Sequence, residues 1–137
     1  MENAAMIIDK RIKVAGDLSY RGKCPQEKSE QQTLVNQVRK KYPELLLTSV
    51  KNEGKRTKAQ MDEDRSMGFL NGVSDLVFFG NPMLFIEMKR QDHTQSTWQA
   101  GQQDFLIRMQ EMGHVSLVAL GWEAAMEAVE DWMRIKK

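Results

Sequence analysis

Apolar positions in the first half of the chain follow helical spacing and then the pattern of a strand. Over residues 29–42 apolar side chains recur every four positions, which predicts an amphipathic helix that Pro43 ends. The apolar run 45–50 predicts a buried strand. A polar, glycine-containing loop over 51–57 and a short helix to about Met67 follow it.

Two further apolar runs, 73–79 and 83–89, flank the turn residues 80–82 and predict an antiparallel hairpin. Steps of two along each strand from a three-residue turn place Asp75 opposite Glu87. The register depends on the length of the turn, because a slip of one residue moves every side chain to the other face.

After the hairpin the chain predicts a helix over 98–112, an apolar strand over 115–120 and an amphipathic C-terminal helix. A helix between the third and fourth strands allows those strands to lie parallel through a right-handed crossover. We therefore expect an α/β fold, a mixed four-stranded sheet with helices on both faces. We expect residues 1–28 to form a loosely ordered N-terminal arm that can contact another subunit, and residues 29–137 to form one domain.

Composition narrows the class of protein. Of the 137 residues 41% are hydrophobic and 28% charged, and no apolar run reaches the length of a membrane span. The start lacks the pattern of a secretion signal, so we expect a cytoplasmic protein with no membrane partner. A single Cys24 excludes an internal disulfide framework and a cysteine-rich zinc site. Two histidines, His93 and His114, are too few for a histidine-rich metal site, and no phosphate-binding glycine loop occurs.

The predicted hairpin carries the candidate chemistry. Asp75, Glu87 and Lys89 project from one face of it, because strand side chains alternate with period 2. Two opposed carboxylates repel each other, and a bound divalent cation reverses the sign of that interaction. The pattern indicates a metal site on the sheet. The alternative is that E-x-K is a solvated edge of a half-exposed strand.

Two helical positions extend this candidate site. Glu30 lies on the apolar stripe of the first helix, unless fraying of the helix start exposes it. Gln102 lies on the buried stripe of the 98–112 helix, whereas Gln103 turns about 100° away. Oxygen ligands suit Mg²⁺ or Mn²⁺, with the backbone carbonyl of Met88 as a further ligand. Glu30 would either complete the shell or bind a second cation or its water. Lys89 would orient or deprotonate a water, or neutralise charge on a phosphoryl group.

Basic residues concentrate in one stretch. Residues 39–58 hold seven basic and two acidic side chains, although the whole chain has a net charge of only +1. Such a stretch either neutralises phosphates or forms a solvated surface.

These motifs together resemble the PD-(D/E)XK nuclease superfamily, and within it the VRR-NUC family of virus-type replication–repair nucleases. They occur in the order Glu30, G-x-x-D at 72–75, E-x-K at 87–89 and Gln102. The likeness covers about residues 29–120 and includes the N-E-G-K-R string at 52–56, which is typical of small stand-alone phage-encoded members. Ser74 stands where the superfamily often has Pro.

The resemblance implies a restriction-endonuclease-like αβββαβ core and Mg²⁺- or Mn²⁺-dependent hydrolysis of DNA, without a small-molecule cofactor. Small members of the family are homodimers implicated in cutting four-way junctions, so we expect a homodimeric junction resolvase. A replisome-associated nickase or flap nuclease, and a catalytically silent DNA-binding module, are the alternatives. The implied catalytic residues are Glu30, Asp75, Glu87, Lys89 and Gln102. The expected DNA contacts are Lys51, Asn52, Lys55, Arg56 and Lys58, with Glu53 as a possible outer-shell carboxylate.

Overall fold

A computed structural model describes residues 7–50 and 56–135 and contains one mixed sheet with helices on both faces. In chain order the elements are β1 (Lys13–Ala15), α1 (Glu27–Lys41), β2 (Leu47–Ser49), α2 (Lys58–Ser66), β3 (Leu76–Phe78), β4 (Leu84–Lys89), a 3₁₀ turn (His93–Gln95), α3 (Gln102–Glu111), β5 (Val115–Leu120) and α4 (Trp122–Ile135). The strand order is β1-β5-β4-β3-β2. β1, β5 and β4 are parallel, and β3 and β2 are antiparallel to their neighbours.

The α/β class, the mixed sheet and the helices on both faces are confirmed, but the count of four strands is wrong. The fifth strand is β1, which pairs in parallel with residues 117–119 of β5. Three residues are too short a run to show the period of a strand, which is why the sequence pattern did not establish it. The predicted boundary at residue 28 falls in the first turn of α1, and the stretch before it supplies β1.

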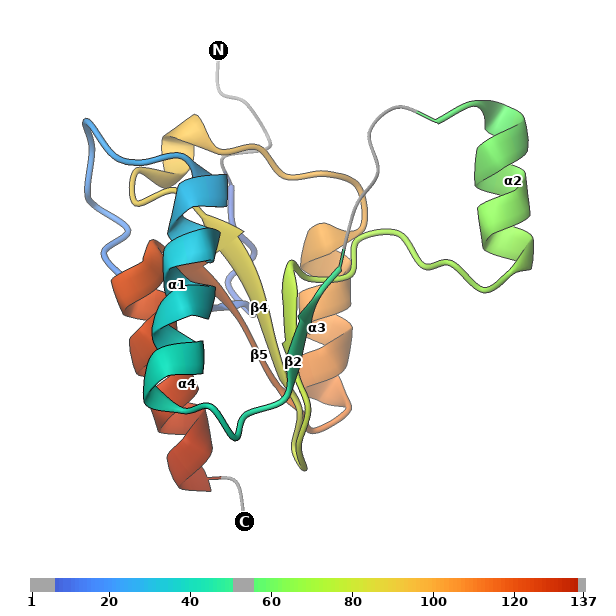
Figure 1. Cartoon of the computed structure of the whole chain (residues 1–137). Helices are drawn as coiled ribbons and strands as arrows, with labels where there is room; N and C mark the ends of the chain where they lie inside the picture. The colour runs from blue at the N-terminus through green and yellow to red at the C-terminus, as the bar shows by residue number, and fades with distance from the viewer. Residues whose placement is uncertain (1–6, 51–55, 136–137) are drawn as a thin grey trace.

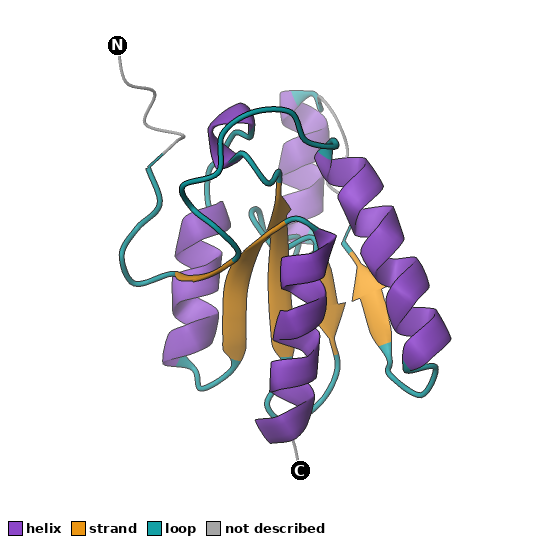
Figure 2. Cartoon of the chain, turned by 90° about the vertical axis from the view of Figure 1, so that its left-hand side faces the viewer, coloured by secondary structure: helices purple, strands orange, loops and turns teal. Residues whose placement is uncertain are grey.

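Alternation along β4 sets the two layers of the core. Leu84, Ile86 and Met88 face the layer of α1 and α4, while Phe85 faces α3 on the other side of the sheet. Figures 1 and 2 show α1 and α4 on one face and α3 on the other. α2 projects from this body and buries none of its residues. No helix in the described part of the chain is long and apolar enough to cross a membrane.

The register of the hairpin is confirmed. Leu76 pairs with Ile86 and Phe78 with Leu84, so the same antiparallel register continued by one step sets Asp75 opposite Glu87. The strand predicted within 45–50 is present as β2, but the prediction that it is buried is wrong. β2 is an edge strand, and its side chains are half-buried or exposed.

Candidate active site

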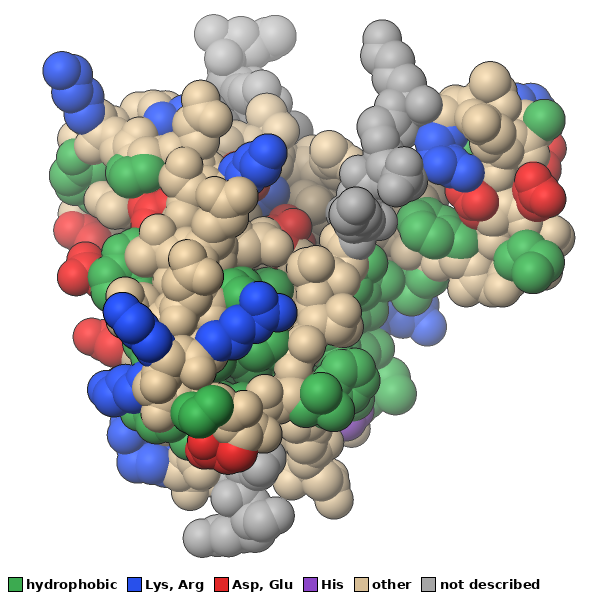
Figure 3. Space-filling view, in the orientation of Figure 1, with side chains coloured by type: hydrophobic (Ala, Val, Ile, Leu, Met, Phe, Trp, Pro, Cys, Tyr) green, Lys and Arg blue, Asp and Glu red, His purple; other side chains and the backbone are tan. Residues whose placement is uncertain are grey.

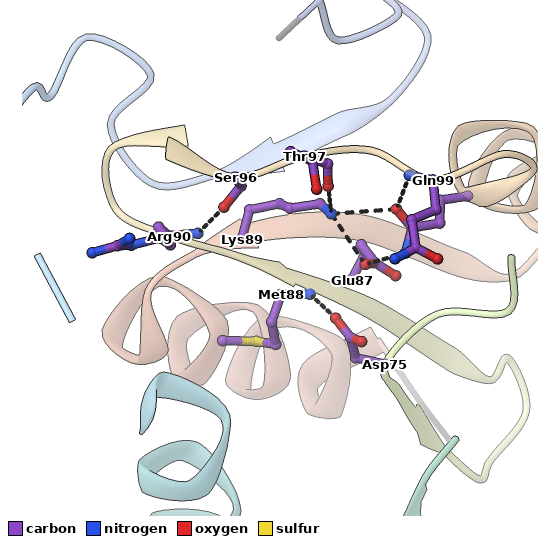
Figure 4. A network of polar contacts seen from close by, with 9 residues as sticks. Asp75, Glu87, Met88, Lys89, Arg90, Ser96, Thr97 and Gln99 are labelled. Atoms are coloured by element: carbon purple, nitrogen blue, oxygen red, sulfur yellow. Dashed lines mark hydrogen bonds and ion pairs between the residues drawn. The ribbon is translucent and has the colours of Figure 1, made fainter. Parts of the chain in front are cut away.

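The site lies where β3 begins and β4 continues past it. Asp75 immediately precedes β3, and its backbone carbonyl accepts a hydrogen bond from Val50 N (3.0 Å). Its carboxylate accepts a hydrogen bond from Met88 N at Oδ2 (2.7 Å), as Figure 4 shows. The side chain of Asp75 therefore occupies the place on β4 where a backbone partner from β3 would otherwise pair.

Glu87 and Lys89 lie on the face of β4 that is covered by α3, and both are almost fully buried, at 1% and 2% exposed. Lys89 Nζ donates hydrogen bonds to the carbonyl of Thr97 (2.6 Å) and to Gln102 Oε1 (3.3 Å). It lies 3.5 Å from Glu87 Oε2 and 4.5 Å from the centre of the Trp98 ring. The ammonium group is thus held by an amide oxygen, a backbone carbonyl, a carboxylate and an aromatic face.

Gln102 connects Lys89 to Glu87. Its Nε2 donates to Glu87 Oε2 (3.0 Å), and its Oε1 also accepts a hydrogen bond from Gln99 N (2.9 Å). This contact fixes which end of the amide faces the lysine, since only the oxygen can accept. Gln102 begins α3 rather than lying in its second turn as expected, because Gly101 with φ +87° precedes the helix.

The glycine of the G-x-x-D motif has a steric role here. Gly72 has φ +85°, and a Cβ built on it would lie 2.4 Å from the carbonyl carbon of Gly101. A side chain at this position would push the segment that leads into Asp75 away from the start of α3. Gly72 therefore allows the Asp75 segment and Gln102 to approach the same part of β4.

Burial dominates the electrostatics of the two carboxyl groups. Burial together with the negative charge of Asp75 raises the pKa of Glu87 to about 9, and Lys89 opposes the shift. Burial also raises the pKa of Asp75, and the hydrogen bond from Met88 N works against that increase. Burial thus favours a shared proton or a bound cation at this pair over two free negative charges.

The donor atoms fit a hard divalent cation. Among the described residues no hydrogen-bond donor reaches Glu87 Oε1, although this oxygen is buried. The carbonyl of Met88 lies on the side of Asp75, because the N–H and C=O of one strand residue point the same way. The described residues contain no cluster of three His, Cys, Asp or Glu side chains placed to hold a metal. Two carboxylates and a carbonyl leave positions for water and phosphate, as Mg²⁺ prefers.

Glu30 lies elsewhere. It is buried on the α1–α4 face of the sheet with Leu34 and Val38, and not on the α3 face with Glu87. Its Oε1 accepts a hydrogen bond from Trp122 N (3.1 Å), and its Oε2 accepts one from the Gln91 side chain (2.9 Å). Glu30 therefore caps the first turn of α4, and among the described residues no hydrogen bond or ion pair joins it to the other four predicted catalytic residues.

The expected DNA contacts divide into two groups. Lys51, Asn52 and Lys55 lie outside the described residues, as does Glu53, the expected outer-shell carboxylate. Arg56 forms an ion pair with Asp64 (2.8 Å), and Lys58 forms one with Asp62 (3.2 Å), so each has an acidic partner on α2.

Sequence reasoning missed two groups that contact Lys89. The carbonyl of Thr97 is a backbone atom, so no residue type signals it. Trp98 falls at the start of the predicted helix over 98–112, but it precedes α3 and its ring lies against the lysine. The sequence signal that could have indicated this contact is an aromatic residue within ten positions of E-x-K, since an aromatic ring attracts a lysine ammonium.

Gln102 and Gln103 provide a matched pair of substitutions. Gln103 accepts a hydrogen bond from Asp9 N (2.9 Å) and donates one to the Ile7 carbonyl (2.9 Å), so it holds the N-terminal segment. If the chain cleaves DNA, as its sequence resemblance implies, Gln102→Ala is expected to lower the cleavage rate by about 10- to 100-fold, because it removes the hydrogen bonds that link Lys89 to Glu87. Gln103→Ala should leave cleavage within about twofold. Single-turnover rates of both variants test this, and equal losses would contradict it.

Comparison with known proteins establishes a likeness of fold. The chain matches no protein-family model, and no curated protein sequence matches it. It is similar to a solved structure described as "VRR_NUC domain protein", with a TM-score of 0.58 and 18% sequence identity. The likeness covers 84% of this chain and 92% of that one. At this identity the conclusion is that the chain has the fold of that structure.

Proposed function

We propose that this chain is a divalent-cation-dependent nuclease of the VRR-NUC type that hydrolyses phosphodiester bonds in DNA. The observation that carries the proposal is the buried pair of carboxyl groups of Asp75 and Glu87 beside Lys89, in which no nitrogen or hydroxyl group of the described residues donates to Glu87 Oε1. Two buried carboxylates side by side repel each other, and a divalent cation bound between them removes that cost, as a shared proton does in its absence. The fold shared with the VRR_NUC domain structure supports the same assignment.

Asp75, Glu87 and the Met88 carbonyl would hold Mg²⁺ or Mn²⁺. Such an ion polarises phosphoryl oxygens and makes a bound water more acidic. The chain's own contribution is geometry and charge. Glu87 is kept in place by Gln102 Nε2, and Asp75 by Met88 N, so neither carboxylate has to reorganise when substrate arrives.

Lys89 would act on the attacking water and on the phosphate. Its ammonium is already bonded to Thr97 O and Gln102 Oε1, which aims it at the side of the site occupied by Glu87. In that position it can orient the water and stabilise the negative charge that develops on the phosphoryl oxygens. In the hydrolysis the water oxygen would form a bond to phosphorus and the bond from phosphorus to one ester oxygen would break. The water would lose its proton to solvent, and the departing ester oxygen would take up a proton from solvent.

Glu30 would support the site from the opposite face of the sheet. Through Gln91, two residues beyond Lys89, it joins the end of β4 to the start of α4. We place it as a positioning residue, and its role is to keep the end of β4 fixed against α1 and α4.

The deciding experiment is cleavage of end-labelled four-way junction, flap, single-stranded and plain duplex DNA in Mg²⁺ and in Mn²⁺, with EDTA as a control. Cutting that requires the cation supports the nuclease. Cutting of flaps or of plain duplex would move the assignment to a flap nuclease or a nickase. DNA binding with no cutting in either cation would leave a silent DNA-binding module.

The finer proposal is a homodimer that cuts a four-way junction, since two sites related by a two-fold axis can place one cut on each of two strands. The segment around α2 offers a surface for a second copy. It projects from the body and exposes Met61 (48%), Met67 (83%), Phe69 (43%) and Leu70 (58%). Exposed apolar side chains gathered on one segment are typical of an interface.

Substituting two of these residues tests the dimer. Met67→Glu with Leu70→Glu is expected to give a monomer by light scattering and to replace paired junction cuts by single nicks. Met112→Glu is the control, because Met112 is also exposed (67%) but lies at the end of α3. A double variant that keeps the wild-type mass would exclude this surface.

A further inference from the structure

A groove of about 1020 Å³ runs between α1 and β2, and Asp75 lies in its wall. Of the active-site residues described above, only Asp75 lines this groove. Most of the remaining wall is built from one side of α1 and from the edge strand β2. The polar residues that matter here are Lys28, Gln32, Asn36, Arg39, Thr48 and Ser49.

The chemistry of this wall suits a sugar–phosphate backbone. An ammonium, a guanidinium, two amides and two hydroxyls are the side-chain groups that proteins use for phosphate and sugar contacts. The acidic residues of the groove are Asp75 and Glu27. Asp75, a residue of the proposed metal site, thus lines the same groove as this polar, basic wall.

Spacing places the α1 residues in one row. Lys28, Gln32 and Asn36 follow at intervals of four and Arg39 comes three later, so they share a side of the helix. From Lys28 to Arg39 the axial rise is about 16 Å, at about 1.5 Å per residue. At roughly 3.4 Å per nucleotide along a duplex, this row spans about five nucleotides of one strand.

The two cations of the row are available for a ligand. In the part of the chain that the structure describes, neither Lys28 nor Arg39 forms an ion pair, whereas Lys41 is held by Glu130 at 2.9 Å. The two described residues expected to bind DNA, Arg56 and Lys58, are also paired with carboxylates. Figure 3 shows Lys and Arg side chains over α1 on the face that also carries β2.

We propose that a DNA strand that passes the active site at Asp75 continues along this groove, held by its sugar–phosphate backbone from Asp75 towards Arg39. The inference rests on the proposed nuclease function and adds the path of the substrate. Because these groups would contact phosphates and sugars rather than base edges, binding along the groove should not depend on base sequence.

Two neighbouring residues make a matched test. Arg39 and Lys40 are both exposed in the last turn of α1, and of the two only Arg39 lines the groove. Binding of a fluorescently labelled 20-base-pair duplex is measured by anisotropy in EDTA, over a series of salt concentrations. Arg39→Ala is expected to lower affinity about fivefold and to reduce the slope of log K against log salt by about one. Lys40→Ala should leave the slope unchanged.

The outcomes separate this inference from the function on which it rests. Equal effects of Arg39→Ala and Lys40→Ala on DNA binding would contradict the proposal that DNA lies in the groove, even if wild-type protein cuts DNA. A loss specific to Arg39→Ala supports the groove. If that loss is seen while wild-type protein cuts no DNA in either cation, the groove stands as a DNA-binding surface and the nuclease assignment fails.

Discussion

Replacing Lys89 by Met is expected to reduce DNA cleavage by about a thousandfold, which is the typical loss when a preorganised charge is removed from a transition state. The ammonium lies 3.5 Å from Glu87 Oε2, and three other groups fix its direction. Methionine fills a similar volume, so packing against Trp98 is largely kept. Single-turnover cleavage rates measure the loss, and anisotropy in EDTA should show DNA binding within about threefold of wild type.

Lys89→Arg separates charge from geometry. A guanidinium keeps the positive charge, but it is planar and cannot reproduce the compact set of contacts to Thr97, Gln102 and Glu87. Little recovery of cleavage in the arginine variant is therefore expected. Thermal melts of both variants control for folding, since Lys89 is buried. A methionine variant that retains more than about a tenth of wild-type cleavage would remove Lys89 from the chemistry.

The hairpin site could be predicted because it depends on short-range rules. A turn of fixed length and the period of 2 along strands set Asp75 opposite Glu87 with Lys89 on the same face, and the pairing of Leu76 with Ile86 confirms the register. Helical periodicity predicted that Gln102 faces inward. This prediction holds although the helix begins several residues later than expected, because the spacing of the buried positions does not depend on where the helix starts. The sequence also predicted correctly that Glu30 faces inward.

Long-range placement could not be predicted in the same way. Periodicity shows that Glu30 is buried, but the face of the sheet on which α1 packs decides whether it meets Glu87 or the start of α4. The carbonyl of Thr97 and the edge position of β2 likewise depend on how segments distant in sequence come together. The apolar run over 45–50 shows the limit clearly, since Leu46 is 67% exposed beside an edge strand.

Glu87→Gln is expected to raise the free energy of unfolding of the protein in the absence of divalent cations. The folded-state pKa of Glu87 is about 9, against an ordinary value of 4.5, so the folded chain binds an extra proton between these values. Its contribution to stability is fully present below about pH 4.5 and is lost as the pH rises towards about 9. Glutamine can still accept the hydrogen bond from Gln102 Nε2 without carrying a charge.

At about pH 8 the variant should therefore be more stable than wild type by on the order of 2–4 kcal/mol, and the two should converge near pH 5. Thermal melts in EDTA across this range measure the difference, with Glu111→Gln on the exposed surface as the control for a generic change of charge. Adding Mg²⁺ should raise the melting temperature of wild type and leave Glu87→Gln almost unchanged, because a ligand stabilises only the state that binds it. If Glu87→Gln instead melts below wild type at about pH 8 in EDTA, the carboxylate contributes to the fold in its charged form. Its unpaired Oε1 would then no longer support a cation site, since the cost of burying the charge would already be met within the protein.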